Sequence, residues 1–327
     1  MQYKSNKGFS GFAQLGMIIL FIGLGLILLG LFQMCIGNLM IPKGTRSENL
    51  EFELMKVMQD PKYVNILRII QAIGTFCLMC LPALIYSWIC NGKSMLWLGF
   101  SRHINAFQIL LGFLIIFTAN IAAVPLEELS RKIIAHIPSL NSMAHRLENI
   151  YNEQVVGLSN LKSWPEFFIA IIIMAFLPAM FEEIFFRGML QNLFVKWWKM
   201  PIVAIIITSL LFSLIHMSVY LFLSRAILGF VLGLMFYKTK NIWVNIVAHF
   251  LNNLMAISML FWQSLHHQKI DLASTDPKPE WWGILAAYVA LFFLFRSLNR
   301  YSEKNKMKIY TREQVLMVND PEGRPLV

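Results

Sequence analysis

Charged residues are scarce in this chain, and their scarcity excludes most soluble folds. Asp, Glu, Lys and Arg make up 14% of the 327 residues, whereas hydrophobic residues make up 57%. Soluble domains are about 25% charged, and a soluble domain this apolar would expose large hydrophobic patches. The apolar residues are gathered into long runs, and a run of about 20 such residues is enough to cross a bilayer. The composition therefore predicts a polytopic membrane protein.

Cysteine is also scarce, with four residues at positions 35, 77, 80 and 90. Cys77 and Cys80 form a CxxC pair, a spacing used in redox and metal sites. The pair lies in the middle of the apolar run TFCLMCLPAL, where no Lys, Arg or His is near enough to stabilise a thiolate. We therefore interpret these cysteines as small hydrophobic residues and infer no redox function.

Long apolar runs predict an all-α polytopic bundle of about eight transmembrane helices, in a membrane domain that covers residues 11–298. Short cytoplasmic segments flank it, at residues 1–10 and 299–327. Two polar segments, 36–63 and 125–164, are predicted to be extramembrane loops with some amphipathic helix. The predicted spans are Gly11–Cys35, Val64–Cys90, Asn105–Val124, Pro165–Gln191, Pro201–Met217, Leu221–Tyr237, Asn241–Leu265 and Trp281–Leu298.

Basic residues near the span ends predict the orientation, because Lys and Arg are retained on the cytoplasmic side. Lys4 and Lys7 precede the first span, so both termini are predicted to be cytoplasmic, which requires an even number of spans. The net charge of +10 is then a topology signal. The cations form no stripe, so we predict no nucleic-acid partner. The cations of the C-terminal tail also predict that this tail is cytoplasmic. They are Arg300, Lys304, Lys306, Lys308, Arg312 and Arg324.

The stretch FEEIFFRGML, residues 181–190, places two carboxylates and an arginine at the end of an apolar span. A charge at the centre of a membrane helix costs a few kcal/mol, so ionisable residues there indicate function by default. Few ionisable residues of the sequence are candidates for such a function. They are Glu182, Glu183, Arg187, His216, Arg225 and His249.

Helical spacing organises these residues into faces. Glu183 and Arg187 are four residues apart, so they share a face and are able to pair. Glu182 lies about 100° around the same helix and is expected to face the interior of the bundle. Pro178, one turn earlier, lacks a backbone N–H and is expected to kink the span.

Two further spans repeat the spacing of four. Phe212 precedes His216 in FSLIH, and His249 precedes Asn253 in HFLNN. Exposure to lipid is costly for each polar group, and that cost is relieved if the groups converge in one polar pocket. We therefore expect these spans to meet the helix that carries Glu182.

A carboxylate, two imidazoles and an amide in a dry cavity suit amide hydrolysis. Glu182 is expected to act as a general base toward water, while His249 and Asn253 donate hydrogen bonds to the oxyanion. Alternatively, His216, His249 and Glu182 bind a zinc or another divalent ion that carries the water. We favour the metal-free version because the sequence contains no HExxH and a side-chain amide is an uncommon zinc ligand.

The ordered set EEIFFR, FSLIH and HFLNN resembles the motifs of the CPBP intramembrane proteases. That family includes the CAAX prenyl endopeptidases and the bacterial Abi-type proteins linked to bacteriocin processing or immunity. The resemblance covers about residues 166–260, the expected catalytic core. It implies an intramembrane endopeptidase, in a bacterial inner membrane, that cleaves a membrane-associated peptide or protein.

The resemblance also implies roles for individual residues. Glu182 and His216 would activate water, and His249 with Asn253 would bind the oxyanion. Three other residues, Glu183, Arg187 and Phe212, would support the site structurally. The family has been labelled both glutamic protease and metalloprotease, so a bound metal stays an alternative.

Two other polar features have simpler interpretations. Glu127 and Glu128 precede Arg131 in PLEELSR, but the spacing is one residue shorter than in the family motif. We interpret this stretch as a solvated helix end or interfacial anchor. Arg225, near the end of a short span, is expected to extend its charge to the membrane interface.

Two rival functions stay open at this stage. A transporter would use the acids as a proton relay and would have repeat-related broken helices, but the sequence has no matching second half. A catalytically silent immunity or scaffold protein would keep the same motifs without cleaving anything.

Overall fold

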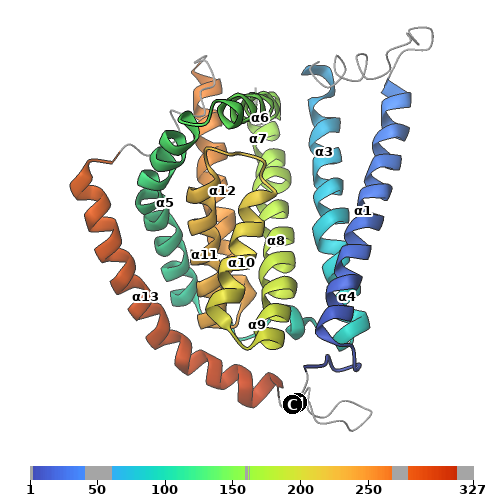
Figure 1. Cartoon of the computed structure of the whole chain (residues 1–327), viewed down its shortest axis with the longest axis vertical. Coiled ribbons are helices and arrows are strands. Elements are labelled where there is room, and N and C mark those ends of the chain that lie inside the picture. The colour runs from blue at the N-terminus through green and yellow to red at the C-terminus, as the bar shows by residue number, and fades with distance from the viewer. Residues whose placement is uncertain (1–2, 41–60, 159–160, 162, 267–278, 315–327) are drawn as a thin grey trace.

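A bundle of helices makes up the regular structure of the computed structural model, which describes residues 3–40, 61–158, 161, 163–266 and 279–314 (Figure 1). Within those ranges no strand occurs, and seven helices are long and apolar enough to cross a membrane. The predicted all-α polytopic membrane bundle is confirmed. The seven spans are Gly11–Gly37, Val64–Asn91, Ala106–Ala135, Trp164–Trp198, Phe222–Thr239, Ile242–Leu265 and Trp281–Glu313.

The fifth predicted span, Pro201–Met217, is a shorter apolar helix. α10 (Pro201–Leu214) has 14 residues and is therefore about 21 Å long, whereas the hydrocarbon core is about 30 Å thick. The helix was predicted to reach Met217. Because it ends at Leu214 instead, residues 215–221 form a non-helical connection to α11 (Phe222–Thr239).

The helices pack in two groups. α5 (Ala106–Ala135) contacts α11, α12 (Ile242–Leu265) and α13 (Trp281–Ile309), and α10 contacts α11. The other group joins α1 (Gly11–Met40) to a span built from α3 (Val64–Thr75), η2 (Phe76–Cys80) and α4 (Leu81–Asn91). Figure 1 shows α1 and α3 on one side and α13 on the other, with α8 between the groups.

The fourth span contains two π-helical segments between its α-helical parts. It runs without a break through α7 (Trp164–Ala170), η4 (Ile171–Phe176), α8 (Leu177–Glu183), η5 (Ile184–Gln191) and α9 (Asn192–Trp198), and both η segments are π-helical. Pro178 stands in the first turn of α8, directly after η4. Its missing N–H is thus accommodated by a wider π turn. Pro82 follows the π-helical η2 in the same way.

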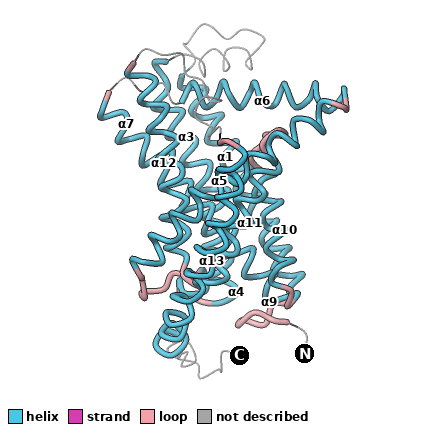
Figure 2. The backbone as a smooth tube through the Cα atoms, turned by 90° about the vertical axis from the view of Figure 1, so that its left-hand side faces the viewer, coloured by secondary structure: helices cyan, strands magenta, loops and turns pink. Residues whose placement is uncertain are grey.

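Segments predicted to be loops contain more helix than expected. α5 continues through Pro125 to Ala135, and α6 (Pro138–Leu158) then lies across the ends of the spans (Figure 2). α13 extends past Leu298 to Ile309. Most of the predicted loop 36–63 lies outside the described residues.

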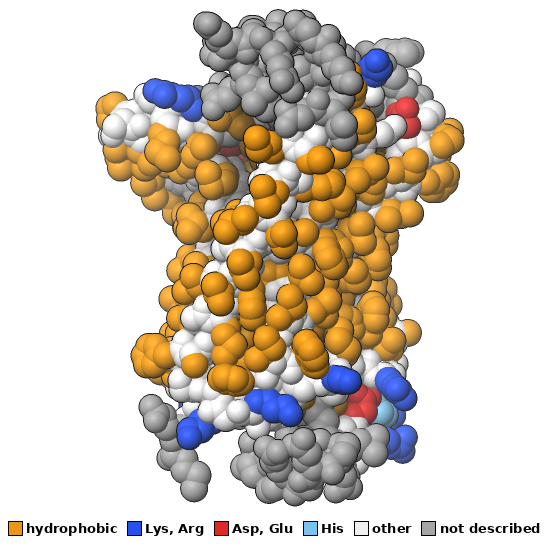
Figure 3. Space-filling view, turned by 90° about the vertical axis from the view of Figure 1, so that its right-hand side faces the viewer, with side chains coloured by type: hydrophobic (Ala, Val, Ile, Leu, Met, Phe, Trp, Pro, Cys, Tyr) orange, Lys and Arg blue, Asp and Glu red, His pale blue; other side chains and the backbone are white. Residues whose placement is uncertain are grey.

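The exterior of the bundle has the character of a lipid-facing surface. Large hydrophobic residues such as Ile27 and Leu31 of α1 and Phe292 of α13 are more than half exposed. Figure 3 shows this apolar belt, with Lys and Arg side chains at its ends. The first described residues and the end of α13 lie at the same end of the bundle (Figure 2).

Candidate active site

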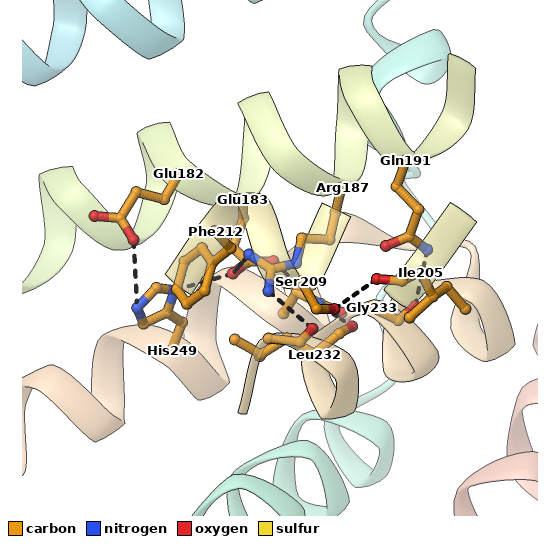
Figure 4. Close-up of polar contacts among 12 residues, drawn as sticks. Glu182, Glu183, Arg187, Gln191, Ile205, Ser209, Phe212, Leu232, Gly233 and His249 are labelled. Carbon is orange, nitrogen blue, oxygen red and sulfur yellow. Dashed lines mark hydrogen bonds and ion pairs between the residues drawn. The ribbon is translucent and has the colours of Figure 1, made fainter. Parts of the chain in front are cut away.

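Glu182, His216 and His249 come together from three separate parts of the chain. Glu182 stands in the last turn of α8, His216 in the connection after α10, and His249 on α12. The Oε2 atom of Glu182 lies 4.0 Å from Nε2 of His216 and 3.8 Å from Nε2 of His249. Figure 4 shows Glu182 and His249 facing each other. The convergence expected from the motifs is thus present for these three residues.

The hydrogen-bond partners of the two histidines assign their tautomers. Nδ1 of His249 lies 2.9 Å from Oε1 of Glu183, and Nδ1 of His216 lies 2.7 Å from the carbonyl oxygen of Phe212. A carbonyl and an ionised carboxylate can only accept, so each Nδ1 donates. In a neutral imidazole Nε2 then carries the lone pair. Each Nε2 is therefore an acceptor close to the Glu182 carboxylate.

The Glu182 carboxylate and the two Nε2 atoms are positioned around one place for a water, which is able to donate hydrogen bonds to two of the three acceptors. The separations of 3.8 and 4.0 Å are too long for direct hydrogen bonds. A water with hydrogen bonds of about 2.8 Å joins partners about 4.6 Å apart at a tetrahedral angle. Oε2 of Glu182 is buried and has no hydrogen-bond partner among the described residues. The arrangement is able to hold and polarise a water.

The same three residues are the ligands of the alternative with a divalent metal. Tetrahedral zinc holds its ligand atoms at about 2.1 Å and thus about 3.4 Å apart, which is shorter than the 3.8 and 4.0 Å separations at Glu182. Within the described parts of the chain, no group of three or more His, Cys, Asp or Glu has the arrangement of a metal site. The residue types are suitable ligands, and the separations of 3.8 and 4.0 Å lie between the values for a shared zinc ion and for a shared water, so we derive no step through a metal.

Glu183 is the buried centre of the surrounding polar network. Its side chain is 0% exposed. Oε1 accepts hydrogen bonds from Nη1 of Arg187 at 3.0 Å and from Nδ1 of His249, and Oε2 accepts one from Nδ2 of Asn245 at 3.1 Å. A carboxylate removed from water is stable when charged and polar donors satisfy it in this way. The predicted pairing of Glu183 with Arg187 is present.

Phe212 packs against the same network. The Cζ atom of Arg187 lies 4.6 Å from the centre of the Phe212 ring, a cation–π distance. The ring centre also lies 4.8 Å from that of His216 and 6.0 Å from that of His249. Phe212 thus separates the fixed guanidinium from the two imidazoles and limits how they turn.

Two glycines on α11 allow the network to reach a backbone. Nη2 of Arg187 donates to the carbonyl of Gly229 at 3.1 Å, and Nε2 of Gln191 donates to the carbonyl of Gly233 at 2.9 Å. A Cβ atom at Gly233 would lie 2.8 Å from both Gln191 Oε1 and Ile205 Cγ2. The GxxxG spacing of these residues permits this close helix contact.

Asn253 stands apart from the three converging residues. Its Nδ2 donates to the carbonyl of Ala175 at 3.5 Å, and among the described residues no contact joins it to Glu182 or to either histidine. Its oxyanion role therefore stays a prediction. Asn245, which the motifs did not predict, contacts Glu183 directly. The spacing held a signal for it, because residues 245, 249 and 253 lie on one face of α12.

α6 holds the connection that carries His216. Ser218 Oγ donates to Glu148 Oε2 at 2.8 Å, and the hydroxyl of Tyr220 donates to Asn141 Oδ1 at 2.9 Å. Met217 has a positive φ of 55°, a strained conformation for a residue other than glycine. The two bonds to α6 thus fix a tightly turned backbone next to His216.

The PLEELSR stretch lies outside this network. Oε1 of Glu127 accepts two hydrogen bonds from Arg131, at 3.0 and 2.9 Å, and the Arg131 side chain is 47% exposed. Its guanidinium lies over the ring of Tyr220 at 4.6 Å. Glu128 is exposed.

A buried network thus orients two imidazoles toward a second carboxylate inside a membrane bundle. Residues 164–255 match the family model described as Rce1-like, type II CAAX prenyl endopeptidase Rce1-like. This match confirms the resemblance inferred from the three motifs, and all the motif residues lie within it. Neither the curated proteins nor the solved structures contain a match to the chain.

Proposed function

We propose that this protein is an intramembrane endopeptidase that hydrolyses a peptide bond of a membrane-associated peptide or protein. One observation carries the proposal. Glu182 Oε2 lies within 4.0 Å of the Nε2 atoms of two oriented imidazoles, in a segment that matches a protease family.

These positions support the following proposed chemistry. Glu182 takes a proton from a water held between it and His216, and the water oxygen forms a bond to the scissile carbonyl carbon. The oxyanion is stabilised by Asn253 and by His249 when Nε2 is protonated. The C–N bond then breaks, and the proton passes to the leaving amine. Glu183 stabilises a His249 imidazolium, as a buried carboxylate does in other hydrolases.

The substrate class comes from the matched family. Its description names CAAX prenyl endopeptidases, and a CAAX sequence lies at the C-terminus of a prenylated protein. We propose that C-terminal peptides of membrane-associated proteins are the first class to test, with and without a prenyl group.

The orientation is also part of the proposal. The end of the bundle where the described chain begins and ends carries many basic residues, including Lys4, Lys7, Lys196 and Lys238. By the positive-inside rule we assign this end to the cytoplasm of a bacterial inner membrane. Labelling of a single cysteine placed at position 7 in intact and in permeabilised cells tests this assignment.

Cleavage by the purified protein tests the function. Wild type in detergent is incubated with the peptide panel, beside Glu182→Ala, His216→Ala and the matched surface control Glu128→Ala, and products are identified by mass spectrometry. We expect wild type and the control to cleave one site that neither site variant cleaves. Cleavage that persists in both site variants contradicts the assignment. A folded wild type that cleaves no peptide would favour the silent scaffold instead.

A further inference from the structure

Arg225, expected from the sequence to extend its charge to the membrane interface, contacts α6. It stands in the first turn of α11, nine residues after His216, and is partly buried. Nη2 donates to the hydroxyl of Tyr151 on α6 at 2.9 Å, and Cζ lies 4.9 Å from the centre of the Tyr151 ring. α6 thus holds this guanidinium against the bundle.

The charge of Arg225 has no acidic partner in the described parts of the chain. Its Nη1 atom is buried and has no hydrogen-bond partner there. Glu148, on the same helix as Tyr151, accepts a hydrogen bond from Ser218, and Glu182 faces the imidazoles. A charge removed from water without a counterion costs several kcal/mol. The positive end of the α11 dipole adds to that cost, so the position favours an anion.

The guanidinium also lies close to the candidate active site. Glu182 and Arg225 are both near enough to the His216 ring to act on it electrostatically. Ser213 Oγ donates to the carbonyl of Phe222 at 2.6 Å, which ties the end of α10 to the start of α11. The connection that carries His216 is therefore short, and its two ends are joined by this bond. Arg225 stands in the first turn of the helix that follows the connection.

We propose that Arg225 binds the C-terminal carboxylate of the peptide substrate and that Tyr151 orients the guanidinium for this contact. The inference rests on the proposed function. A guanidinium presents paired N–H donors that match both oxygens of a carboxylate, and one of its arms is unpartnered here. A chain end held at Arg225 places cleavage a few residues from the C-terminus, since an extended chain advances about 3.3 Å per residue.

Three forms of one cleaved peptide test this proposal on the purified full-length protein. One has a free C-terminal acid, one has a C-terminal carboxamide, and one has the free acid with each internal Asp or Glu replaced by its amide. The measured quantity is the ratio of kcat/KM for the acid to that for the carboxamide. It is determined for wild type, Arg225→Gln, Arg225→Lys, Tyr151→Phe and the control Arg131→Gln, with melting temperatures recorded for each.

We expect wild type and Arg131→Gln to prefer the free acid at least about tenfold. Arg225→Gln should bring the ratio close to one, whereas Arg225→Lys and Tyr151→Phe should retain part of the preference. A wild-type ratio near one overturns the proposal, as does a full preference in a folded Arg225→Gln. A preference that follows the internal acids overturns it too. In these cases cleavage itself persists, so the proposed function stands; absence of any cleavage refutes both.

Discussion

Nδ1 of His249 donates a hydrogen bond to Oε1 of Glu183 at 2.9 Å and joins two helices that are 66 residues apart in sequence. This bond gives Glu183 a different role from that of the adjacent Glu182. Both oxygens of Glu183 accept hydrogen bonds, from Arg187, His249 and Asn245. Glu182, in contrast, has one oxygen that no described residue contacts by a hydrogen bond. One acid supports the site, and its neighbour is left for chemistry.

Replacing Glu183 by glutamine should destabilise the fold. The change leaves the guanidinium of Arg187, 2% exposed, without its counterion, and breaking one partner of a buried ion pair costs about 3–5 kcal/mol. Thermal unfolding in detergent measures the effect, with the exposed Glu128→Gln as the matched control. We expect a lower melting temperature for Glu183→Gln than for the control. Equal melting temperatures would mean that the pair contributes nothing to stability.

Two of the asparagines of α12, Asn253 and Asn245, should respond to replacement in opposite ways. Asn253→Ala should lower kcat about 10²–10³-fold, the usual effect of removing an oxyanion donor, with little change in the melting temperature. Asn245→Ala should cost about 1–3 kcal/mol of stability, since it leaves buried partners unsatisfied. Turnover and unfolding are measured on both variants. An Asn253→Ala enzyme as fast as wild type would remove the oxyanion role.

A methyl group at Gly233 should disturb the contact between α10, α11 and η5. Its Cβ would lie 2.8 Å from Ile205 Cγ2 and Gln191 Oε1, and overpacking of this kind costs about 1–3 kcal/mol. Gly16→Ala is the control, because a Cβ there meets nothing within 4 Å. We expect Gly233→Ala to melt at a lower temperature and Gly16→Ala to be unchanged or slightly more stable. A Gly233→Ala protein as stable as Gly16→Ala would contradict the close packing.

Treatment with a chelator separates the two mechanisms. Because the sequence contains no HExxH and a side-chain amide is an uncommon zinc ligand, we expect cleavage to be unchanged after dialysis against EDTA or 1,10-phenanthroline. The peptide products are quantified before and after treatment. Loss of cleavage that added zinc restores would establish the metal alternative with His216, His249 and Glu182 as its ligands.

The sequence predicts the site best where a charged residue is costly in a membrane helix and has a partner four residues away. Charges in a membrane helix are costly, so Glu182 and His249 stood out against apolar surroundings. The spacing of four predicted that Glu183 pairs with Arg187, and the pair forms even though η5 is π-helical. Long apolar runs predicted the spans because the bilayer fixes their minimum length.

The rest depends on contacts that spacing does not contain. Apolar residues continue past Leu214, so no residue pattern indicates that α10 ends there and leaves His216 in a connection. Pro125 suggested a helix end, yet α5 continues through it. The contact of Arg225 with Tyr151 joins residues 74 positions apart, and such pairings are set by tertiary packing.

The rate of Glu182→Gln tests the central claim most directly. Glutamine keeps the size of the side chain but is unable to take a proton from water. Single-turnover cleavage is measured for Glu182→Gln and wild type on the same peptide, with equal melting temperatures as the condition for comparison. The account predicts a loss of at least about 10²-fold, the lower end for general base catalysis. A rate within about twofold of wild type would show that Glu182 does not activate the water.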